Sequence, residues 1–342
     1  MTDLDRYVRQ MRFGPIGKDG QQQICDARAL ICGCGALGSV LANTLARAGV
    51  GHLRIVDRDF LELNNLQRQV LYDEQDVESG LPKAVAAAKR LSAINSQITV
   101  EPIVADVDHS NIGELVEGMD VLLDGTDNFE TRYLLNDAAL KFETPWVFGG
   151  CIGAEGQTMT VIPGKTPCFR CLMPDAPPPG STPTCDSAGI LSPIINIIAS
   201  YQANEALKIL SGHADAVSPH LNVFELWDNR IRQIELDSLA SIECPACKGG
   251  DYVWLNGSKG SHSAILCGRN AVQLSFAERR SLDLAALAQQ LEEVGEVSTN
   301  RYLLRLEVDE YQLTVFTDGR AIIKGTEEIA EAKTVYAKYI GH

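Results

Sequence analysis

The chain has 342 residues, of which 45% are hydrophobic, and its formal net charge is −15. This hydrophobic content supports a full core and excludes a disordered chain. The negative charge argues against broad binding to nucleic acid or to an anionic membrane surface, because contact with phosphates needs a basic face. No apolar signal segment follows Met1, so we expect a cytoplasmic protein whose ten cysteines serve as metal ligands or reactive thiols.

Strand and helix patterns alternate through the first 150 residues. After a helical N-terminal segment (1–26), the patterns predict strands at 28–34, 52–56, 99–104, 120–124 and 146–149, and helices at 39–48, 83–95 and 129–141. Such alternation predicts an α/β fold with a doubly wound, mostly parallel, Rossmann-like sheet. Its ligand is expected at the carboxyl ends of the strands.

The second half of the chain is more varied. The proline-rich segment 174–184 predicts an extended, mobile loop, the centre of a crossover loop at about 172–189. Polar residues interrupt the apolar stretch 190–210, which favours a buried core or interface helix over a membrane span. We place a domain boundary near residue 250. The region 251–342 is predicted to be a small α+β domain with strands at 264–275, 302–308, 312–316 and up to 323, and helices at 284–294 and 327–340.

Four cysteines form two Cys-x-x-Cys pairs, namely Cys168, Cys171, Cys244 and Cys247. Four thiolates fill the tetrahedral coordination of Zn²⁺ and leave no position open for water. The pairs therefore predict a structural zinc site. The alternative, four unrelated thiols, is less compatible with this spacing.

A glycine-rich loop lies between the first predicted strand and the helix after it. Gly33, Gly35 and Gly38 follow the G-x-G-x-x-G pattern, which lets the backbone approach phosphate oxygens at a helix N-terminus. Asp57 lies near the end of the second predicted strand, where an acid binds ribose hydroxyls. The pattern alone does not distinguish binding of NAD, FAD and ATP. The alternative to a nucleotide-binding loop is a tight turn without a ligand.

Charged residues after these strands favour ATP over a dinucleotide. Arg68 and Lys83 supply the cations that a triphosphate losing pyrophosphate needs. Asp127 follows the strand at 120–124 and is a credible ligand for Mg²⁺, which prefers carboxylates and phosphate oxygens. The alternative role at this position is a helix N-cap formed by Asp127 or Asn128.

Over about residues 4–250 the chain resembles the MoeB/ThiF family, the bacterial relatives of ubiquitin-activating enzymes. The motifs that carry the resemblance occur in the family's order: Arg6-Tyr-x-Arg9-Gln10, the glycine loop, Asp57-x-Asp59, Asn65-Leu-Gln-Arg68-Gln69, Pro82-Lys83, Asp124-x-Thr-Asp127-Asn128 and both cysteine pairs. The resemblance implies an ATP-dependent adenylyltransferase. Its substrate would be the C-terminal glycine of a ubiquitin-like sulfur carrier protein (MoaD/ThiS-like) ending in Gly-Gly, for sulfur transfer in cofactor biosynthesis.

The resemblance also assigns roles to residues. It implies nucleotide binding by the three glycines of the loop and by Asp57, Asp59, Asn65, Arg68, Gln69, Lys83 and Asp127. Arg9 would reach the ATP site of the other subunit in a homodimer. Cys185 aligns with a reactive cysteine that some members use for a thioester or acyl-persulfide step, the alternative being a bystander thiol.

Other functions remain open from the sequence. An activating enzyme of a bacterial ubiquitin-like protein-conjugation pathway would use the same chemistry. A dinucleotide-dependent oxidoreductase is disfavoured by Arg68, Lys83 and Asp127, and a non-catalytic scaffold is disfavoured by the presence of every matched position. For 251–342 the expected role is docking of the carrier or of a downstream enzyme.

Overall fold

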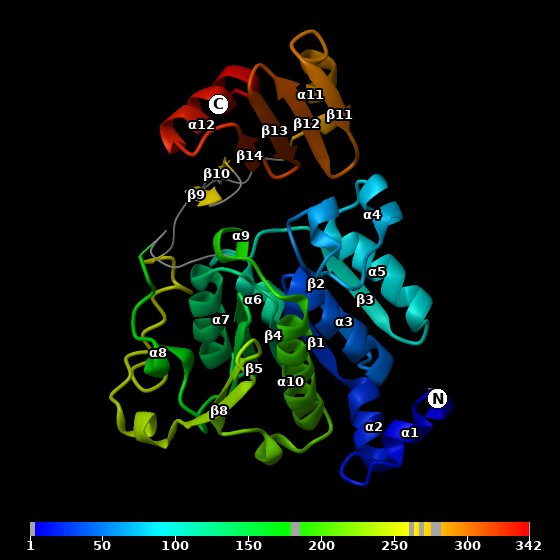
Figure 1. Cartoon of the computed structure of the whole chain (residues 1–342), viewed down its shortest axis with the longest axis vertical. Coiled ribbons are helices and arrows are strands. Elements are labelled where there is room, and N and C mark those ends of the chain that lie inside the picture. The colour runs from blue at the N-terminus through cyan, green and yellow to red at the C-terminus, as the bar shows by residue number, and fades with distance from the viewer. Residues whose placement is uncertain (1–3, 179–184, 260–262, 267–269, 275–281, 342) are drawn as a thin grey trace. The chain divides into compact units, whose positions relative to one another are not determined.

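A computed structural model describes residues 4–178, 185–259, 263–266, 270–274 and 282–341 of the chain (Figure 1). Contacts divide the chain into two compact units. The first comprises Met1–Pro179 and Ile190–Lys259, and the second comprises Gly180–Gly189 and Gly260–His342. Each unit has its own sheet, with apolar side chains packed on both faces in the first unit and a single core in the described part of the second.

The first unit is built on an eight-stranded sheet with the order β3-β2-β1-β4-β5-β6-β7-β8. The four pairings from β3 to β5 are parallel and the three from β5 to β8 are antiparallel. The chain turns from one half of the parallel sheet to the other between β1 and β4, and ligands of open α/β sheets bind at such a switch point. The strands are β1 (Arg28–Cys32), β2 (His52–Val56), β3 (Thr99–Ile103), β4 (Val121–Asp124), β5 (Trp146–Ile152), β6 (Glu155–Val161), β7 (His220–Glu225) and β8 (Arg230–Glu235).

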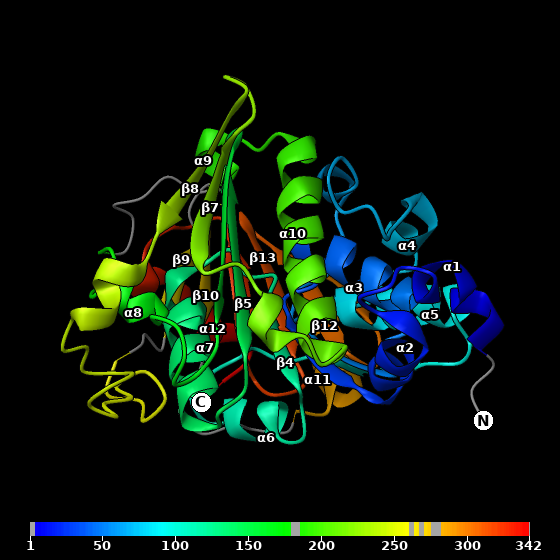
Figure 2. The ribbon, with the colours of Figure 1, turned by 90° about the horizontal axis from the view of Figure 1, so that it is seen from below.

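Helices cover both faces of the parallel half of this sheet, as Figure 2 shows. Apolar side chains of α3, α5 and α10 form one core with the sheet, and those of α6 and α7 form a second core on the other face. All four residues of β4 are buried, which is typical of a strand covered on both sides. The helices are α1 (Val8–Met11), α2 (Gly17–Asp26), α3 (Ala36–Ala48), α4 (Glu74–Glu78), α5 (Lys83–Ile94), α6 (Ile112–Val116), α7 (Phe129–Lys141), α8 (Phe169–Leu172) and α10 (Ser192–Leu210), with short 3-10 helices at Leu4–Tyr7, Leu63–Asn65, Ala214–Ala216 and Asp237–Ser241.

The second unit has a six-stranded antiparallel sheet with the order β11-β12-β13-β14-β10-β9. Apolar residues of its central strands pack with α11 and α12 to form the core. The elements are α9 (Cys185–Ala188), β9 (Ser263–Leu266), β10 (Ala271–Leu274), α11 (Leu284–Leu291), β11 (Glu296–Thr299), β12 (Leu303–Val308), β13 (Tyr311–Phe316), β14 (Ala321–Lys324) and α12 (Ile329–Tyr339).

The predicted doubly wound sheet and the additional α+β region are confirmed, and the helix at 129–141 and the strand at 52–56 have the predicted bounds. The single strand predicted at 264–275 is wrong. It is two antiparallel strands, β9 and β10, and Asn270 next to β10 has a left-handed φ of 44°. The sequence analysis also missed β6, β7, β8 and β11. All six residues of β8 are exposed, so this strand carries no burial alternation that a sequence pattern would reveal.

No helix in the described part of the chain is long and apolar enough to cross a membrane. The apolar stretch expected to form a core helix is α10, which has 19 residues. Its buried residues include Ile194, Ile198 and Ala203 in the core shared with α3 and α5. The prediction of a core helix in this stretch is therefore confirmed.

Candidate nucleotide and metal sites

The glycine loop joins β1 to α3, and two of its glycines are fixed by close backbone contacts. Gly33 has a φ of +85°, and a Cβ there would lie 2.7 Å from the carbonyl oxygen of Gly125. A Cβ on Gly38 would lie 1.9 Å from the carbonyl oxygen of Gly33. A Cβ on Gly35 would have Gln69 Nε2 as its nearest neighbour, at 3.7 Å. The fold therefore needs Gly33 and Gly38, whereas Gly35 leaves space beside the N-terminus of α3.

Asp57 holds this loop from the end of β2. Its Oδ2 accepts the backbone N–H of Cys34 at 2.6 Å, and its Oδ1 accepts the backbone N–H of Asp59 at 2.7 Å. Burial raises the pKa of Asp57, and the positive charge of Lys83 opposes that shift only in part. Tyr72, which sequence reasoning missed, donates its hydroxyl to the carbonyl oxygens of Cys34 (2.8 Å) and Lys83 (3.2 Å). The loop is thus tied to β2 and to α5.

The predicted cations lie on segments that border this loop. Lys83 is the first residue of α5, and its buried Nζ lies 3.3 Å from Asp59 Oδ2. Arg68 is half-buried and donates from Nη1 to the carbonyl oxygen of Asn64 at 3.0 Å. Gln69 is buried, and its Oε1 has no hydrogen-bond partner in the described residues. Gln69 borders the open space at Gly35, and a buried acceptor without a donor in this position fits a ligand-binding surface.

The segment after β4 separates two roles that the sequence left open. Asn128 is the N-cap of α7, and its side chain accepts the backbone N–H of Thr131 at 2.9 Å. Asp127 is exposed and precedes this cap. A carboxylate that is not used for capping and faces solvent fits Mg²⁺, because that ion keeps several waters and takes one or two protein carboxylates.

A buried ion pair supports the same segment. Asp124 is fully buried, and its Oδ1 accepts both the backbone N–H (2.9 Å) and the hydroxyl (2.7 Å) of Thr126. Its Oδ2 lies 3.4 Å from Nε of Arg132, a residue of α7 that sequence reasoning missed. The Arg132 guanidinium also lies over the rings of Phe129 and Phe148, at 5.3 and 5.4 Å from their centroids. This packing fixes the loop that carries Asp127.

Sequence reasoning also missed Arg58, although it stands between two residues of a recognised motif. Arg58 Nη1 lies 2.6 Å from Asp106 Oδ2, and its Nε lies 3.7 Å from Asp59 Oδ1. Despite the opposing effect of burial, Asp106 and Asp59 hold the pKa of Arg58 well above its ordinary value. Asp106 lies three residues beyond β3, so only the fold brings the two side chains together.

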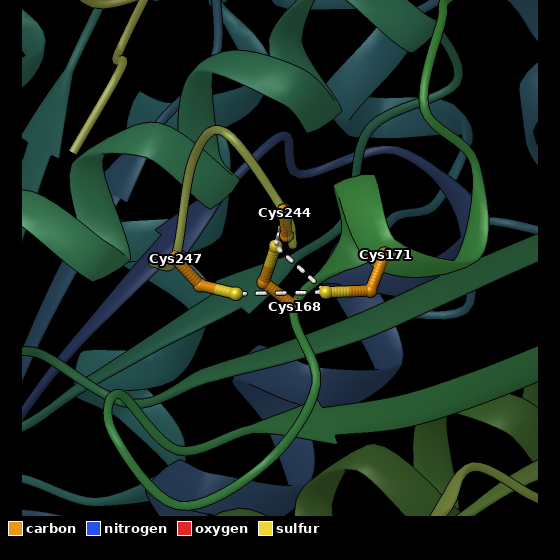
Figure 3. A group of neighbouring side chains, drawn as sticks. All are labelled: Cys168, Cys171, Cys244 and Cys247. Atoms are coloured by element: carbon orange, nitrogen blue, oxygen red, sulfur yellow. Dashed lines mark hydrogen bonds between the residues drawn. The ribbon is translucent and has the colours of Figure 1, made fainter. Parts of the chain in front are cut away.

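The four predicted zinc ligands form one cluster, shown in Figure 3. The Sγ–Sγ distances are 3.8 Å for Cys168–Cys171, 3.7 Å for Cys168–Cys244 and 3.5 Å for Cys171–Cys247, and all four sulfurs lie within 4.8 Å of one another. A tetrahedron with Zn–S bonds of about 2.3 Å has edges of about 3.8 Å. The donor set and its spacing therefore fit Zn²⁺. Burial raises the pKa of Cys171 to about 12, so without a cation this thiol is protonated at neutral pH.

The segments that carry these cysteines are anchored on α7. Asn136 Oδ1 accepts the backbone N–H of Phe169 at 2.8 Å, and Asp137 Oδ2 accepts that of Trp254 at 3.0 Å. Arg170 Nη1 donates to the carbonyl oxygen of Asp251 at 2.7 Å. The same helix therefore begins beside Asp127 and supports the cysteine cluster near its middle.

The remaining predicted residues are less constrained. Arg9 is exposed on α1, and its predicted reach into another subunit stays a prediction. Cys185 is the first residue of α9, but its side chain lies outside the described part of the structure. Cys32 and Cys34, on either side of Gly33, are fully buried.

Comparisons with known proteins bear on this architecture. The model of the ThiF family matches residues 7–246. The chain belongs to the ThiF family. It is 46% identical over 337 residues to the "Sulfur carrier protein ThiS adenylyltransferase" of Bacillus subtilis, covering 98% of this chain and 99% of that protein. It is 39% identical over 249 residues to the "SAMP-activating enzyme E1" of Haloferax volcanii, covering 73% of this chain and 90% of that protein.

Solved structures share this fold. A crystal structure of Escherichia coli MccB with MccA-N7isoASN superposes with a TM-score of 0.60 at 22% identity, covering 68% of this chain and 73% of that one. MccB with ATP superposes with a TM-score of 0.58, again at 22% identity, covering 68% of this chain and 72% of that one. The predicted membership of the MoeB/ThiF family is confirmed by the family match and by the near full-length relative.

Proposed function

We propose that this chain is an ATP-dependent adenylyltransferase that activates the C-terminal glycine of a ubiquitin-like sulfur carrier protein. The observation that carries the proposal is the 46% identity to a ThiS adenylyltransferase over nearly the whole of both chains. Because that similarity includes the second unit as well as the sheet with the glycine loop, we further propose a ThiS-like carrier. Neither a dinucleotide oxidoreductase nor a dedicated conjugation enzyme is favoured by the names of the relatives, although one relative is a SAMP-activating enzyme.

The proposed adenylation requires little covalent chemistry by the protein itself. The carrier's carboxylate attacks the α-phosphorus of ATP, pyrophosphate leaves, and an acyl adenylate remains. Negative charge grows on the phosphate oxygens, so cations held in place in advance supply most of the catalysis. Lys83 is suited to this role because its buried ammonium is already oriented by Asp59. Arg68 is proposed as the second phosphate-binding cation.

The remaining site residues are proposed to bind and orient the nucleotide. The backbone at Gly35 and the positive end of α3 would receive phosphate oxygens, and Asp57 would accept ribose hydroxyls with the oxygen lone pairs that Cys34 and Asp59 do not use. Asn65 and Gln69 are proposed to form hydrogen bonds with the nucleotide through their side-chain amides. Asp127 would hold Mg²⁺, which when bound would neutralise charge on the triphosphate.

The proposal also includes a bound zinc ion, a homodimer and a docking role for the second unit. Zn²⁺ would be held by Cys168, Cys171, Cys244 and Cys247, and it would act on stability because four sulfurs leave no open position. Arg9 would complete the ATP site of a second copy in a homodimer. The second unit is proposed to dock the carrier or a downstream enzyme.

The test is carrier-dependent ATP–pyrophosphate exchange against a panel of carriers that end in Gly-Gly. A matched carrier that lacks its last glycine is the control, because it keeps the docking surface and removes the reacting carboxylate from its place. We expect exchange with at least one intact carrier and none with its truncated form. Exchange that is independent of the tail, or absent with every carrier in a protein that binds ATP, would refute the proposal.

A further inference from the structure

The side chains of Arg58 and Asp106 form a short ion pair at the carboxyl edge of the sheet. Arg58 is the second residue after β2, and Asp106 is the third residue after the neighbouring strand β3. Their charged atoms are 2.6 Å apart, and each side chain is 26% exposed. The pair is therefore fixed in position yet still presents a surface to solvent.

The pair lies where the base of a bound nucleotide is expected. The phosphate-binding loop follows β1, and the proposed ribose-binding acid Asp57 follows β2, the next strand outward. In sheets of this type the pyrophosphate lies at the helix N-terminus after the first strand and the ribose lies at the acid after the second. A nucleotide placed in this way carries its base outward along the same edge, towards the end of β3. Arg58 and Asp106 stand at that place.

The chemistry of the pair suits a base better than a phosphate. A guanidinium is planar, and it stacks on aromatic rings. Asp106 at 2.6 Å and Asp59 at 3.7 Å already offset its charge, so it attracts an anion less than a cation without acidic neighbours would. A carboxylate on the edge of the guanidinium fixes the plane and leaves the face of the group for stacking.

We propose that the Arg58–Asp106 pair is the base-binding element of the nucleotide site, with the guanidinium stacked on the adenine ring and Asp106 fixing its plane. The inference rests on the proposed function for the identity of the nucleotide. It assigns to Arg58 a contact with substrate and to Asp106 a positioning role. Neither residue is among those that the family motifs single out.

The experiment separates base binding from phosphate binding. ATP binding is measured by calorimetry without any carrier, for the wild type, Arg58→Ala, Arg58→Phe and Asp106→Ala. Inorganic tripolyphosphate, which has no base, is measured as a competitor of ATP. We expect Arg58→Ala to weaken ATP binding roughly tenfold, the size of a desolvated stacking contact, while the affinity for tripolyphosphate stays within twofold. Arg58→Phe keeps a flat surface and should restore most of the ATP affinity, and Asp106→Ala should be intermediate.

The matched control is Arg54→Ala. Arg54 lies on the same strand, and its Nε forms a similar ion pair with Glu101 of β3 at 2.9 Å, but it is four residues nearer the start of β2. Its removal should leave ATP affinity unchanged. Equal losses for ATP and tripolyphosphate in Arg58→Ala would overturn the inference, as would an unchanged affinity for ATP in that variant. Thermal unfolding of each variant shows whether it is folded. If Arg58→Ala is not folded, the ATP affinities of Arg58→Phe and Asp106→Ala decide, and an affinity of Arg58→Phe that is not above that of Asp106→Ala would overturn the inference.

If the proposed function is wrong, the measurements give a different result. In that case the wild type binds ATP but shows no carrier-dependent exchange, while the effect of Arg58→Ala on ATP affinity remains. If exchange is present, Arg58→Ala should raise the KM for ATP and leave kcat at saturating ATP within twofold, because stacking on the base does not change as the α-phosphate reacts. A variant whose kcat falls with its KM unchanged would contradict a base-binding role.

Discussion

Asp57 Oδ2 accepts the backbone N–H of Cys34 over 2.6 Å, so the residue proposed to bind ribose also holds the glycine loop. One carboxylate thus links the ends of β1 and β2. Its other oxygen accepts the N–H of Asp59, whose own carboxylate orients Lys83. The loop, the acid and the phosphate-binding cation are therefore one connected group rather than three separate motifs.

Substitutions of two glycines in this loop should have different effects. Gly38→Ala would place a Cβ 1.9 Å from the Gly33 carbonyl oxygen, so backbone must move and the free energy of unfolding should fall by about 2 kcal/mol or more. Gly35→Ala meets only Gln69 Nε2 at 3.7 Å, so it should fold normally but bind ATP weakly. Urea denaturation and ATP calorimetry measure the two effects. A Gly35→Ala variant with full ATP affinity would remove that residue from the site.

Asp127→Ala should abolish carrier-dependent ATP–pyrophosphate exchange in a protein that stays folded, because the variant loses the proposed Mg²⁺ carboxylate. Asn128→Ala is the control on the next residue. It removes the cap of α7 and should cost about 1 kcal/mol of stability while exchange is retained. Exchange at the wild-type rate in Asp127→Ala would exclude this residue from the mechanism.

The purified protein should contain one zinc per chain. Cys244→Ser should lose the metal and unfold at a lower temperature, because a closed four-sulfur site contributes folding free energy, while exchange per folded molecule changes little. Cys25→Ser is a suitable control, since Cys25 is a half-buried thiol of the same unit outside the cluster. Metal analysis that finds no zinc, with the four thiols open to alkylation in the native protein, would contradict the assignment.

Glu101 should make stability depend on pH. Burial acts to raise its pKa, but hydrogen bonds from Arg54 and His52 outweigh burial and hold the pKa below the ordinary 4.5. A carboxyl whose pKa is lower in the folded chain stabilises it above its unfolded pKa, and this contribution is lost as the pH falls through the folded value. Glu101→Gln should therefore reduce stability at pH 7 by at most about 1 kcal/mol, because the side chain is partly exposed and screened. In urea denaturation the difference from wild type should shrink below about pH 4, and a difference that grows there would contradict this sign.

Cys185→Ala should retain pyrophosphate exchange yet lose any covalent adduct between enzyme and carrier, and it should slow downstream sulfur transfer. The reason is that none of the residues proposed to bind ATP is a nucleophile for the acyl group. Mass spectrometry without reductant detects the adduct. Full-rate transfer by the variant, or an adduct on a different cysteine, would make Cys185 a bystander.

The sequence predicted those features that depend on neighbours along the chain. The glycine loop, the acid that follows β2 and the two cysteine pairs have fixed spacings, so their roles follow from local patterns. Arg58 and Asp106 are 48 residues apart, and Arg132 and Asp124 meet only because β4 and α7 pack together. Contacts of this kind depend on the assembled sheet. The outermost strand, β8, was missed for a different reason, since all six of its residues are exposed and leave no periodic signal.

The cysteine cluster has a consequence for the unfolded chain. Cys168 and Cys244 are 76 residues apart, and the stretch between them contains α10, β7 and β8. A link across a stretch of this length lowers the conformational entropy of the denatured ensemble. In the chain-entropy treatment of a covalent cross-link, this destabilises the unfolded state by roughly 4.5 kcal/mol. A metal ion that stayed bound to part of the cluster after unfolding would keep this stretch closed. Refolding in the presence of zinc should then be faster than refolding in a chelator, because the ends of the segment no longer have to find each other.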